Sequence, residues 1–162
     1  MRYTLAAMTD PEPQDFAEAA NQTADGWMRA NGLRFVRATR DEVIAELEVA
    51  PHHLQALGLV HGGIHASIIE TVCSFGAAIN ALAEGRTVVG LENHTSFLRA
   101  ARGGTLRATA KPLTRGRRSQ VWEATVADEN GRALATGRVR LIVLEQNAEV
   151  AGERVEYKPQ ES

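Results

Sequence analysis

The sequence predicts an α+β domain in which a curved antiparallel sheet wraps around one long central helix. Strand-like and helical patterns follow one another in the order of two strands, one long helix and four strands. The long helix is apolar almost all round, so other elements are expected to enclose it. The chain has 162 residues and no internal repeat, which predicts a single domain with a substantial core.

Three elements are expected before the central helix. Residues 13–32 carry apolar side chains near a 3.6-residue period and end at Gly32, which predicts an N-terminal helix over this range. Residues 33–40 and 42–49 suit two strands joined by a tight turn, because apolar and polar residues alternate in the second of them. Residues 1–12 are expected to form a flexible arm.

The central helix is expected over residues 62–82, and the rest of the domain is expected to be rich in strands. Glycine-containing turns separate four further strand candidates, at residues 87–99, 105–113, 120–127 and 132–144. Pro112 has no N–H to donate to a sheet ladder, so its strand is expected to be frayed or at an edge there. The domain is expected to span residues 13–145, and the polar residues 146–162 to form a flexible tail.

The composition of the chain limits the function classes to consider. The formal net charge is −2, so no general attraction to nucleic acid or to an anionic membrane is implied. The single cysteine, Cys73, rules out an intrachain disulfide and fits a reducing compartment. No signal peptide is expected, and no stretch is expected to be long and apolar enough to span a bilayer. A cytoplasmic protein is therefore expected.

The chemistry is expected near the start of the central helix. A helix that begins at Gly62 and Gly63 directs backbone N–H groups and a positive dipole end at whatever lies in front of it. Glu70 interrupts the apolar pattern of the same helix, and burying a carboxylate is costly unless it is paired or functional. Together these groups suit the attack of water on a carbonyl. The alternative is a structural carboxylate paired with an arginine or a histidine.

Three neighbours complete the expected catalytic set. Gln55 or His61 could donate a second hydrogen bond to the carbonyl oxygen, although His61 could equally cap the helix. Ser74 lies one turn after Glu70 on the same face, where it could orient the carboxylate or a water molecule. Glu70 would act as a general base or as a nucleophile. His65 is expected to be a packing or interface residue.

The spacing along this helix predicts a site shared between two chains. Eight residues separate Gly62 from Glu70, which at 1.5 Å per residue is roughly 12 Å along the helix axis. Both residues of one helix therefore cannot contact the same carbonyl group. A two-fold dimer with antiparallel central helices would bring Gly62 of one subunit to Glu70 of the other. Two composite sites per dimer are expected.

Several stretches of the chain resemble a known enzyme family. The order of elements and the helix entry His61-Gly62-Gly63 are similar to those of the hotdog-fold acyl-CoA thioesterases of the phenylacetate-degradation and 4-hydroxybenzoyl-CoA type, over residues 33–145. The branch of this family that uses a glutamate is matched at four positions, Gln55, Gly62, Glu70 and Ser74. The dihydroxynaphthoyl-CoA and enterobactin-proofreading thioesterase group is matched over three further stretches, residues 88–92, 99–102 and 111–122.

The resemblance implies a thioester substrate, no cofactor beyond the CoA that the substrate carries, and a homodimer assembled into a tetramer. Gly63 and Phe97 are expected to contact the substrate. Phe97 stands where that group has a histidine near the aryl ring, so an apolar pocket for an aryl or medium-chain acyl group is expected. Between residues 86 and 118, eight basic residues stand against one acidic residue. Arginines of this segment are expected to hold the CoA phosphates: Arg99, Arg102, Arg115, Arg117 and Arg118.

Other functions stay open on the sequence alone. His61 and His65 are spaced as in a zinc-binding His-Glu-x-x-His helix, but Gly62 replaces the glutamate and two glycines suit such a helix poorly, so no metal is expected. A non-catalytic protein of the same fold that binds or senses acyl-CoA is the main alternative to the enzyme. A dehydratase of this fold would need a separate His/Asp dyad, which the sequence does not show.

Overall fold

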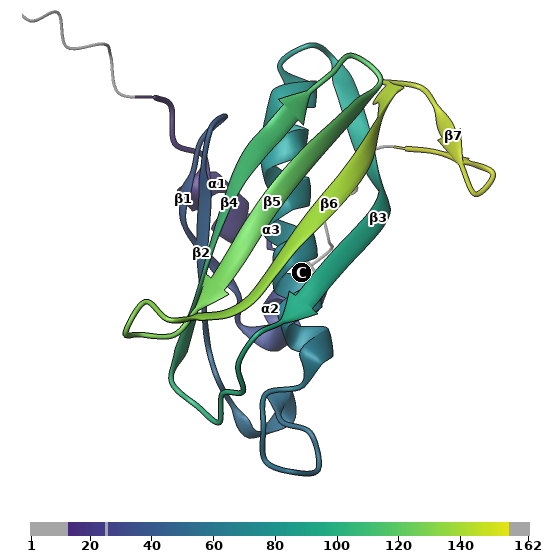
Figure 1. Ribbon diagram of the computed structural model, residues 1–162. Helices are drawn as coiled ribbons and strands as arrows, with labels where there is room; N and C mark the ends of the chain where they lie inside the picture. The colour runs from purple at the N-terminus through teal and green to yellow at the C-terminus, as the bar shows by residue number, and fades with distance from the viewer. Residues whose placement is uncertain (1–12, 25, 156–162) are drawn as a thin grey trace, which may run out of the picture.

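The structure, a computed structural model, describes residues 13–24 and 26–155 and confirms the predicted α+β class. Six strands form one antiparallel sheet in the order β1-β2-β4-β5-β6-β3, and the central helix α3 runs along one face of it (Figure 1). The strands are β1 (Arg34–Ala38), β2 (Val43–Glu48), β3 (Arg86–Phe97), β4 (Thr105–Arg115), β5 (Ser119–Ala127) and β6 (Ala133–Glu145). Each predicted strand is confirmed, with ends that shift by one or two residues.

The central helix α3 spans Gly62–Leu82, as the sequence predicts. A short 3₁₀ helix, η1 (Pro51–His53), and a loop lead into it. His61 caps its N-terminus, because the ring nitrogen Nδ1 of His61 accepts a hydrogen bond from the Gly63 N–H at 2.9 Å. Gly85 follows its end with a φ of +67°, a left-handed conformation that glycine adopts without steric cost.

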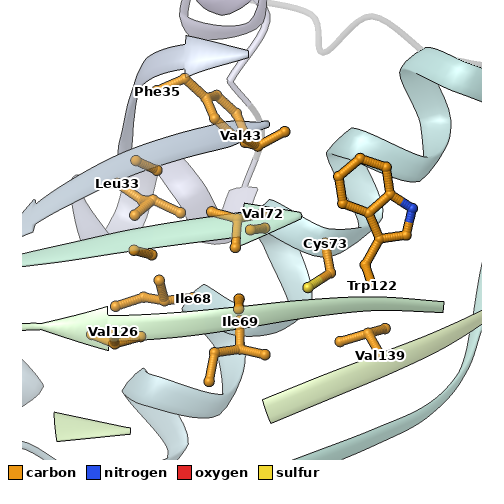
Figure 2. Packing of buried hydrophobic residues seen from close by; sticks show 14 of the residues in the cluster. Leu33, Phe35, Val43, Ile68, Ile69, Val72, Cys73, Trp122, Val126 and Val139 are labelled. Carbon is orange, nitrogen blue, oxygen red and sulfur yellow. The ribbon is translucent and has the colours of Figure 1, made fainter. Parts of the chain in front are cut away.

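The hydrophobic core lies between α3 and the inner face of the sheet (Figure 2). Ile68, Ile69 and Val72 come from α3, and Val126 and Val139 face them from β5 and β6. All five side chains are at most 1% exposed. At roughly 1.5–3 kcal/mol for each large apolar side chain removed from water, this contact is the main force that holds the helix on the sheet.

Trp122 fixes how closely β5 approaches α3. Its ring lies against Gly76, where an added Cβ would come within 2.5 Å of two ring atoms. The indole Nε1 donates to Gln120 Oε1 at 3.0 Å, and Gln120 Nε2 donates to the carbonyl oxygen of Ala77 at 3.3 Å. The polar edge of this buried ring is therefore satisfied, and a small residue in the helix is what lets the ring fit.

One side of α3 and one edge of the sheet stay uncovered within the described part of the chain. Glu70, Ser74 and Phe75 of α3 are only partly buried, so the expectation of an enclosed helix is met on the sheet side alone. β3 pairs with β6 along its whole length and has no strand on its other side among the described residues. The second half of β3 is largely exposed, including Leu91 and Phe97. A long exposed edge of this kind is a template for pairing with another chain.

The prediction of one continuous N-terminal helix over residues 13–32 is wrong. The structure has two short helices, α1 (Ala17–Gln22) and α2 (Gly26–Asn31). At the end of α1, the Thr23 hydroxyl donates to carbonyl oxygens one turn earlier in the helix, and a side chain that bonds the backbone in this way competes with helix continuation. The Asn21 side chain exchanges two hydrogen bonds with the backbone of β1, which ties α1 to the sheet.

Pro112 lies within β4, which is an internal strand of the sheet. The pairing of β4 with β2 ends at Ala110, so Pro112 faces no neighbouring strand on that side in the described structure. A register shift between Pro112 and Thr114 marks a bulge on the other side. The expectation of an edge at Pro112 is therefore confirmed locally, although not for the strand as a whole.

Residues 146–162, expected to be a flexible tail, contain some regular structure. β7 (Glu149–Val150) and β8 (Glu153–Arg154) form a two-stranded hairpin that projects from the end of β6 (Figure 1). The sequence did not predict these two strands, and the flexibility of the tail stays a prediction. The expected arm at residues 1–12 lies outside the described residues.

The expectation that no stretch could span a bilayer also needs correction. By length and composition alone α3 is sufficient, with 21 residues and a mean hydropathy of 1.3. Core helices of soluble proteins pass the same test, because burial against a sheet selects the same apolar residues. In this fold the sheet-facing side of α3 forms the core, which accounts for its composition.

Candidate active site

Glu70 is held by hydrogen bonds to both of its carboxylate oxygens. The Ser74 hydroxyl donates to Oε1 at 3.1 Å from the next turn of α3, which confirms the predicted contact between these residues. The Asn93 amide donates to Oε2 at 3.1 Å from β3. None of the ion pairs among the described residues includes Glu70, so the alternative of a structural carboxylate paired with a cation is not what the structure has.

Asn93 and Gly90 of β3 complete the support of the carboxylate, and the sequence did not identify either. The Asn93 Nδ2 also donates to the carbonyl oxygen of Ala66 at 3.0 Å, and its Oδ1 accepts from the Thr95 hydroxyl at 2.7 Å. These two contacts fix the orientation of the amide. At Gly90 an added Cβ would lie 2.7 Å from Glu70 Oε1, so only glycine leaves room for the carboxylate there. A signal was present for Gly90, since residues 88–92 matched the thioesterase group, but not for Asn93.

The Glu70 side chain opens into a hollow of about 350 Å³, here named the Glu70 hollow. It lies beside α2 and β3, and its lining residues are Trp27, Met28, Glu70, Thr71, Ser74, Phe75, Ala78 and Val88. Apart from Glu70, Thr71 and Ser74, these side chains are apolar. Met28 is also part of the core, at 9% exposure. A carboxylate beside an apolar hollow could act on an apolar ligand at its polar end.

The start of α3 carries the second group of expected residues. The Gly63 N–H is used by the His61 cap, so His61 acts as the capping residue and its Nδ1 is not a donor. The hydrogen bonds of the described residues include none from the Gly62 N–H, the first donor of the helix. Gln55 Oε1 accepts from the Leu57 N–H at 2.7 Å, which leaves the Gln55 amide NH₂ to donate elsewhere. Gly62 and Gln55 are therefore available as donors, and a neutral His61 ring that accepts at Nδ1 still carries an N–H on Nε2.

These donors face a second hollow, of about 300 Å³, here named the Gly62 hollow. Its lining residues are Gln55, Leu59, Val60, Gly62, His65, Phe97, Leu98, Arg99 and Ala100. The Phe97 ring lies directly over Gly62, where an added Cβ would come within 2.8 Å of it. The structure thus brings Gln55, Gly62 and Phe97 together, as the sequence predicts for the substrate side of the site.

The two hollows do not share a lining residue, so one chain does not bring Gly62 and Glu70 to the same place. Their separation follows from their positions at the start of α3 and two turns further along. The chemistry expected from the sequence needs both groups on one carbonyl. Within a single chain this requirement is not met.

Two of the five arginines expected to bind phosphate, Arg99 and Arg102, lie near the start of α3. Arg102 Nη1 donates to the carbonyl oxygen of Leu57 at 3.0 Å, which ties it to the loop before the helix. Arg99 lines the Gly62 hollow and donates to the carbonyl oxygen of Ala133 at 2.8 Å. Both side chains remain exposed enough to meet a ligand as well.

The other three arginines lie at the opposite end of α3. Arg115 pairs with Asp41 at 2.8 Å and donates to Asn80 Oδ1 at 3.3 Å, close to the last turn of the helix. Arg117 and Arg118 follow in the turn between β4 and β5, and no hydrogen bond or ion pair among the described residues uses their side chains. With α3 roughly 30 Å long, one chain does not gather all five arginines into a single phosphate site.

The described residues contain no group of three or more His, Cys, Asp or Glu side chains placed to hold a metal ion. His61 and His65, the spaced pair that suggested zinc, differ in their surroundings. The His61 ring caps the helix, whereas the His65 ring is 3% exposed. Cys73 is fully buried, and burial raises the pKa of its thiol, so it is an inert core residue.

Comparisons with known proteins agree with this geometry. The family model "Thioesterase superfamily" matches residues 57–135. The esterase-designated protein Rv1847 of Mycobacterium tuberculosis (strain ATCC 25618 / H37Rv) is 43% identical over 116 residues, which cover 70% of this chain and 83% of the relative. The proofreading thioesterase EntH of Cronobacter sakazakii is 36% identical over 128 residues, which cover 78% of this chain and 93% of the relative. The solved structure of thioesterase HI1161 from Haemophilus influenzae has a TM-score of 0.75 at 30% identity, covering 80% of this chain and 90% of that one.

Proposed function

We propose that this chain cleaves an acyl-CoA with an aryl or medium-chain acyl group. The premise is that the chain belongs to the thioesterase superfamily and is a thioester hydrolase. Water adds to the thioester carbonyl carbon, the carbon–sulfur bond breaks, and the departing thiolate takes up a proton. The products are the free acid and CoA. The observation that carries the proposal is a carboxylate, Glu70, held on both oxygens at the edge of an apolar hollow without a cationic partner among the described residues.

Glu70 acts on the carbonyl carbon in this proposal. As a general base it takes a proton from the attacking water, and as a nucleophile it forms an anhydride that water then opens. The contacts from Ser74 and Asn93 hold the carboxylate in one orientation, which favours either route over a freely rotating side chain. The aryl or aliphatic part of the substrate lies against the apolar side chains of the two hollows, Phe97 among them.

The carbonyl oxygen is proposed to bind at the start of α3. Negative charge develops on this oxygen when the carbonyl is attacked, and backbone N–H groups at a helix start stabilise such charge. Gly62 supplies the N–H, and Gln55 supplies an amide NH₂ from the same hollow. The Gly63 N–H serves the cap instead, so its contact with the substrate is limited to its backbone position beside Gly62.

We propose that two chains form each site, as the separation of the two hollows requires. The exposed edge of β3 and the uncovered side of α3 lie next to one another, and both carry groups of the site. Pairing two copies across this edge with antiparallel helices would set Gly62 of one chain before Glu70 of the other. A tetramer of two such dimers and the lack of any cofactor beyond CoA are proposed from the resemblance alone.

The CoA phosphates are proposed to bind arginines at the ends of the sheet, where the side chains of Arg117 and Arg118 make no hydrogen bond or ion pair among the described residues. Replacing both by alanine is expected to raise KM more than it lowers kcat, because the nucleotide lies far from the reacting bond. Arg138→Ala is the matched control, since Arg138 is on the outer face of the sheet and pairs with Glu123. An unchanged KM in the double variant would remove these two arginines from the site.

The experiment that tests the function measures free-thiol release from a panel of aryl-CoA and straight-chain acyl-CoA thioesters. Glu70→Gln and Glu70→Ala are expected to lower kcat by about 10²–10⁴ while the fold is kept. Glu123→Gln, on the outer face of β5, is the matched control and is expected to behave like the parent protein. Retained hydrolysis in either Glu70 variant would reject its role. Tight acyl-CoA binding without turnover would instead identify a non-catalytic acyl-CoA sensor.

A further inference from the structure

His65 is a buried polar side chain of the central helix α3. It is 3% exposed, and its Nδ1 is a buried atom that makes no hydrogen bond among the described residues. Leaving a buried polar atom unpaired is costly, so a residue of this kind in a mostly apolar helix calls for a reason. The position of His65 in the fold, rather than its burial alone, supplies that reason.

His65 lines the Gly62 hollow together with both carbonyl-binding groups, Gly62 and Gln55. Residues three apart on a helix share a face at roughly 5–6 Å, and helical side chains lean toward the N-terminus, so the ring covers the turn that begins at Gly62. The Phe97 ring lies beside it, with 6.3 Å between the ring centroids. Among the side chains that line this hollow, Gln55, His65 and Arg99 are the polar ones.

The chemistry of the ring defines what it can bind. Burial lowers the pKa of His65, which keeps the imidazole neutral near pH 7. A neutral imidazole has one N–H donor and one acceptor, which together match a hydroxyl group, and its donor alone matches a carbonyl oxygen. The thioester carbonyl already has two donors in the Gly62 N–H and the Gln55 amide. The ring is therefore free to bind another oxygen of the substrate, and the acyl group is the part that is proposed to lie against Phe97 in this same hollow.

We propose that His65 recognises an oxygen substituent of the acyl group, carried close to the thioester carbonyl, and so gives the enzyme a preference for oxygenated acyl groups over their hydrocarbon counterparts. The inference rests on the proposed thioesterase function and names the substrate class of that same site. Helix spacing places the substituent roughly 5–6 Å from the carbonyl-binding N–H. Phe97 supplies the apolar wall against which the rest of the acyl group lies.

The test compares matched substrates: octanoyl-CoA with its 2-, 3- and 4-hydroxy derivatives, and benzoyl-CoA with its hydroxy derivatives. The parent protein is expected to prefer one hydroxylated member by at least about tenfold in kcat/KM, which corresponds to one satisfied hydrogen bond. His65→Leu, similar in size, is expected to bring that ratio close to one, because the leucine side chain makes no hydrogen bond to either member of a substrate pair. His65→Asn keeps a donor and an acceptor and is expected to restore part of the preference.

Other results overturn the inference. The absence of any preference in the parent protein, or a ratio that His65→Leu leaves unchanged, makes His65 a packing residue. If His65→Leu loses kcat equally on all substrates, His65 contacts the thioester carbonyl oxygen, which all of them share. Non-hydrolysable ketone analogues of the same CoA esters, titrated calorimetrically, give the ratio without turnover, so the inference is tested even if the proposed hydrolysis fails. Thermal unfolding of both variants checks that they fold.

Discussion

At the residue scale, one atom tests the proposed carbonyl site: the amide hydrogen of Gly62. Proline at the first position of a helix keeps the helix and removes this hydrogen. His61 has an extended backbone, with ψ of 136°, which suits the residue before a proline. Gly62→Pro is therefore expected to lower kcat by about 10²–10³ and to leave helix content unchanged by circular dichroism.

The control for this change is Gly62→Ala. It also adds a Cβ against the Phe97 ring, but it keeps the N–H. Phe97 is 60% exposed and can move aside, so the alanine variant is expected to retain most of its kcat. If both variants lose activity equally, contact with Phe97 and not the hydrogen bond is what matters at this position.

Gly90 is the second residue whose replacement separates activity from stability. Gly90→Ala places a Cβ 2.7 Å from Glu70 Oε1, and the end of a flexible side chain can shift to relieve this contact. The fold is expected to survive, whereas kcat falls by about tenfold or more because the carboxylate leaves its place. Gly103→Ala, which meets no atom within 4 Å, is the matched control. Equal kcat values for the two variants would show that the carboxylate tolerates displacement.

The sequence predicts those parts of the site that lie close together along the chain. Ser74 and Glu70 are one helical turn apart, so their contact follows from helix geometry. Asn93 lies 23 residues from Glu70, and its contact exists only because β3 packs beside α3. Gly90 depends on the same packing. A role that arises where two elements meet has no periodic signal in one sequence, which is why these two residues were missed.

At the scale of elements, the contact of α3 with β5 can be tested at Gly76. Alanine favours a helix by about 1 kcal/mol over glycine, but its Cβ would lie 2.5 Å from the Trp122 ring, which is fully buried. Overpacking of this kind costs about 1–3 kcal/mol, so Gly76→Ala is expected to lower the free energy of unfolding in urea. A gain in stability would mean that the ring can move.

A double variant identifies the cause of that loss. Trp122→Phe removes the far part of the indole, whose atoms are the ones that an added Cβ at Gly76 would meet. Gly76→Ala is therefore expected to be less destabilising, or stabilising, in the Trp122→Phe background. Additive effects of the two substitutions would assign the loss to something other than their contact.

Elements with a strong and continuous pattern were predicted well, and weaker ones were not. The bounds of α3 follow from its apolar pattern between a capping histidine and a glycine. The segment before β1 has a helical period too, but hydrogen bonds from Thr23 and Asn21 divide and anchor it. The Thr23 bonds are local to α1, whereas the Asn21 bonds depend on the neighbouring β1 strand, so a tertiary contact adds to the local break in the helix.

At the scale of the whole molecule, strand order puts β1 and β3 at the two edges of the sheet, and the β1 edge is tied to α1 through Asn21. β6 pairs with both β5 and β3, which leaves β3 at the other edge. β3 is the strand whose Asn93 and Gly90 contact Glu70. The sequence predicts the strands but not this order, because pairing between strands far apart in the chain has no local signal. It does predict the need for a second chain, since the rise of a helix alone separates Gly62 from Glu70.

A mixture of two inactive variants tests whether the sites are composite. Gly62→Pro and Glu70→Ala each remove one half of the proposed site, so each homodimer is expected to be inactive. When the two are unfolded together and refolded at equal amounts, half of the dimers contain one chain of each kind. In such a dimer one site carries both lesions and the other carries none, so the mixture is expected to regain about one quarter of the parent activity. Sites built within a single chain would leave the mixture as inactive as its components, and refolded parent protein, carried through the same steps, gives the reference rate.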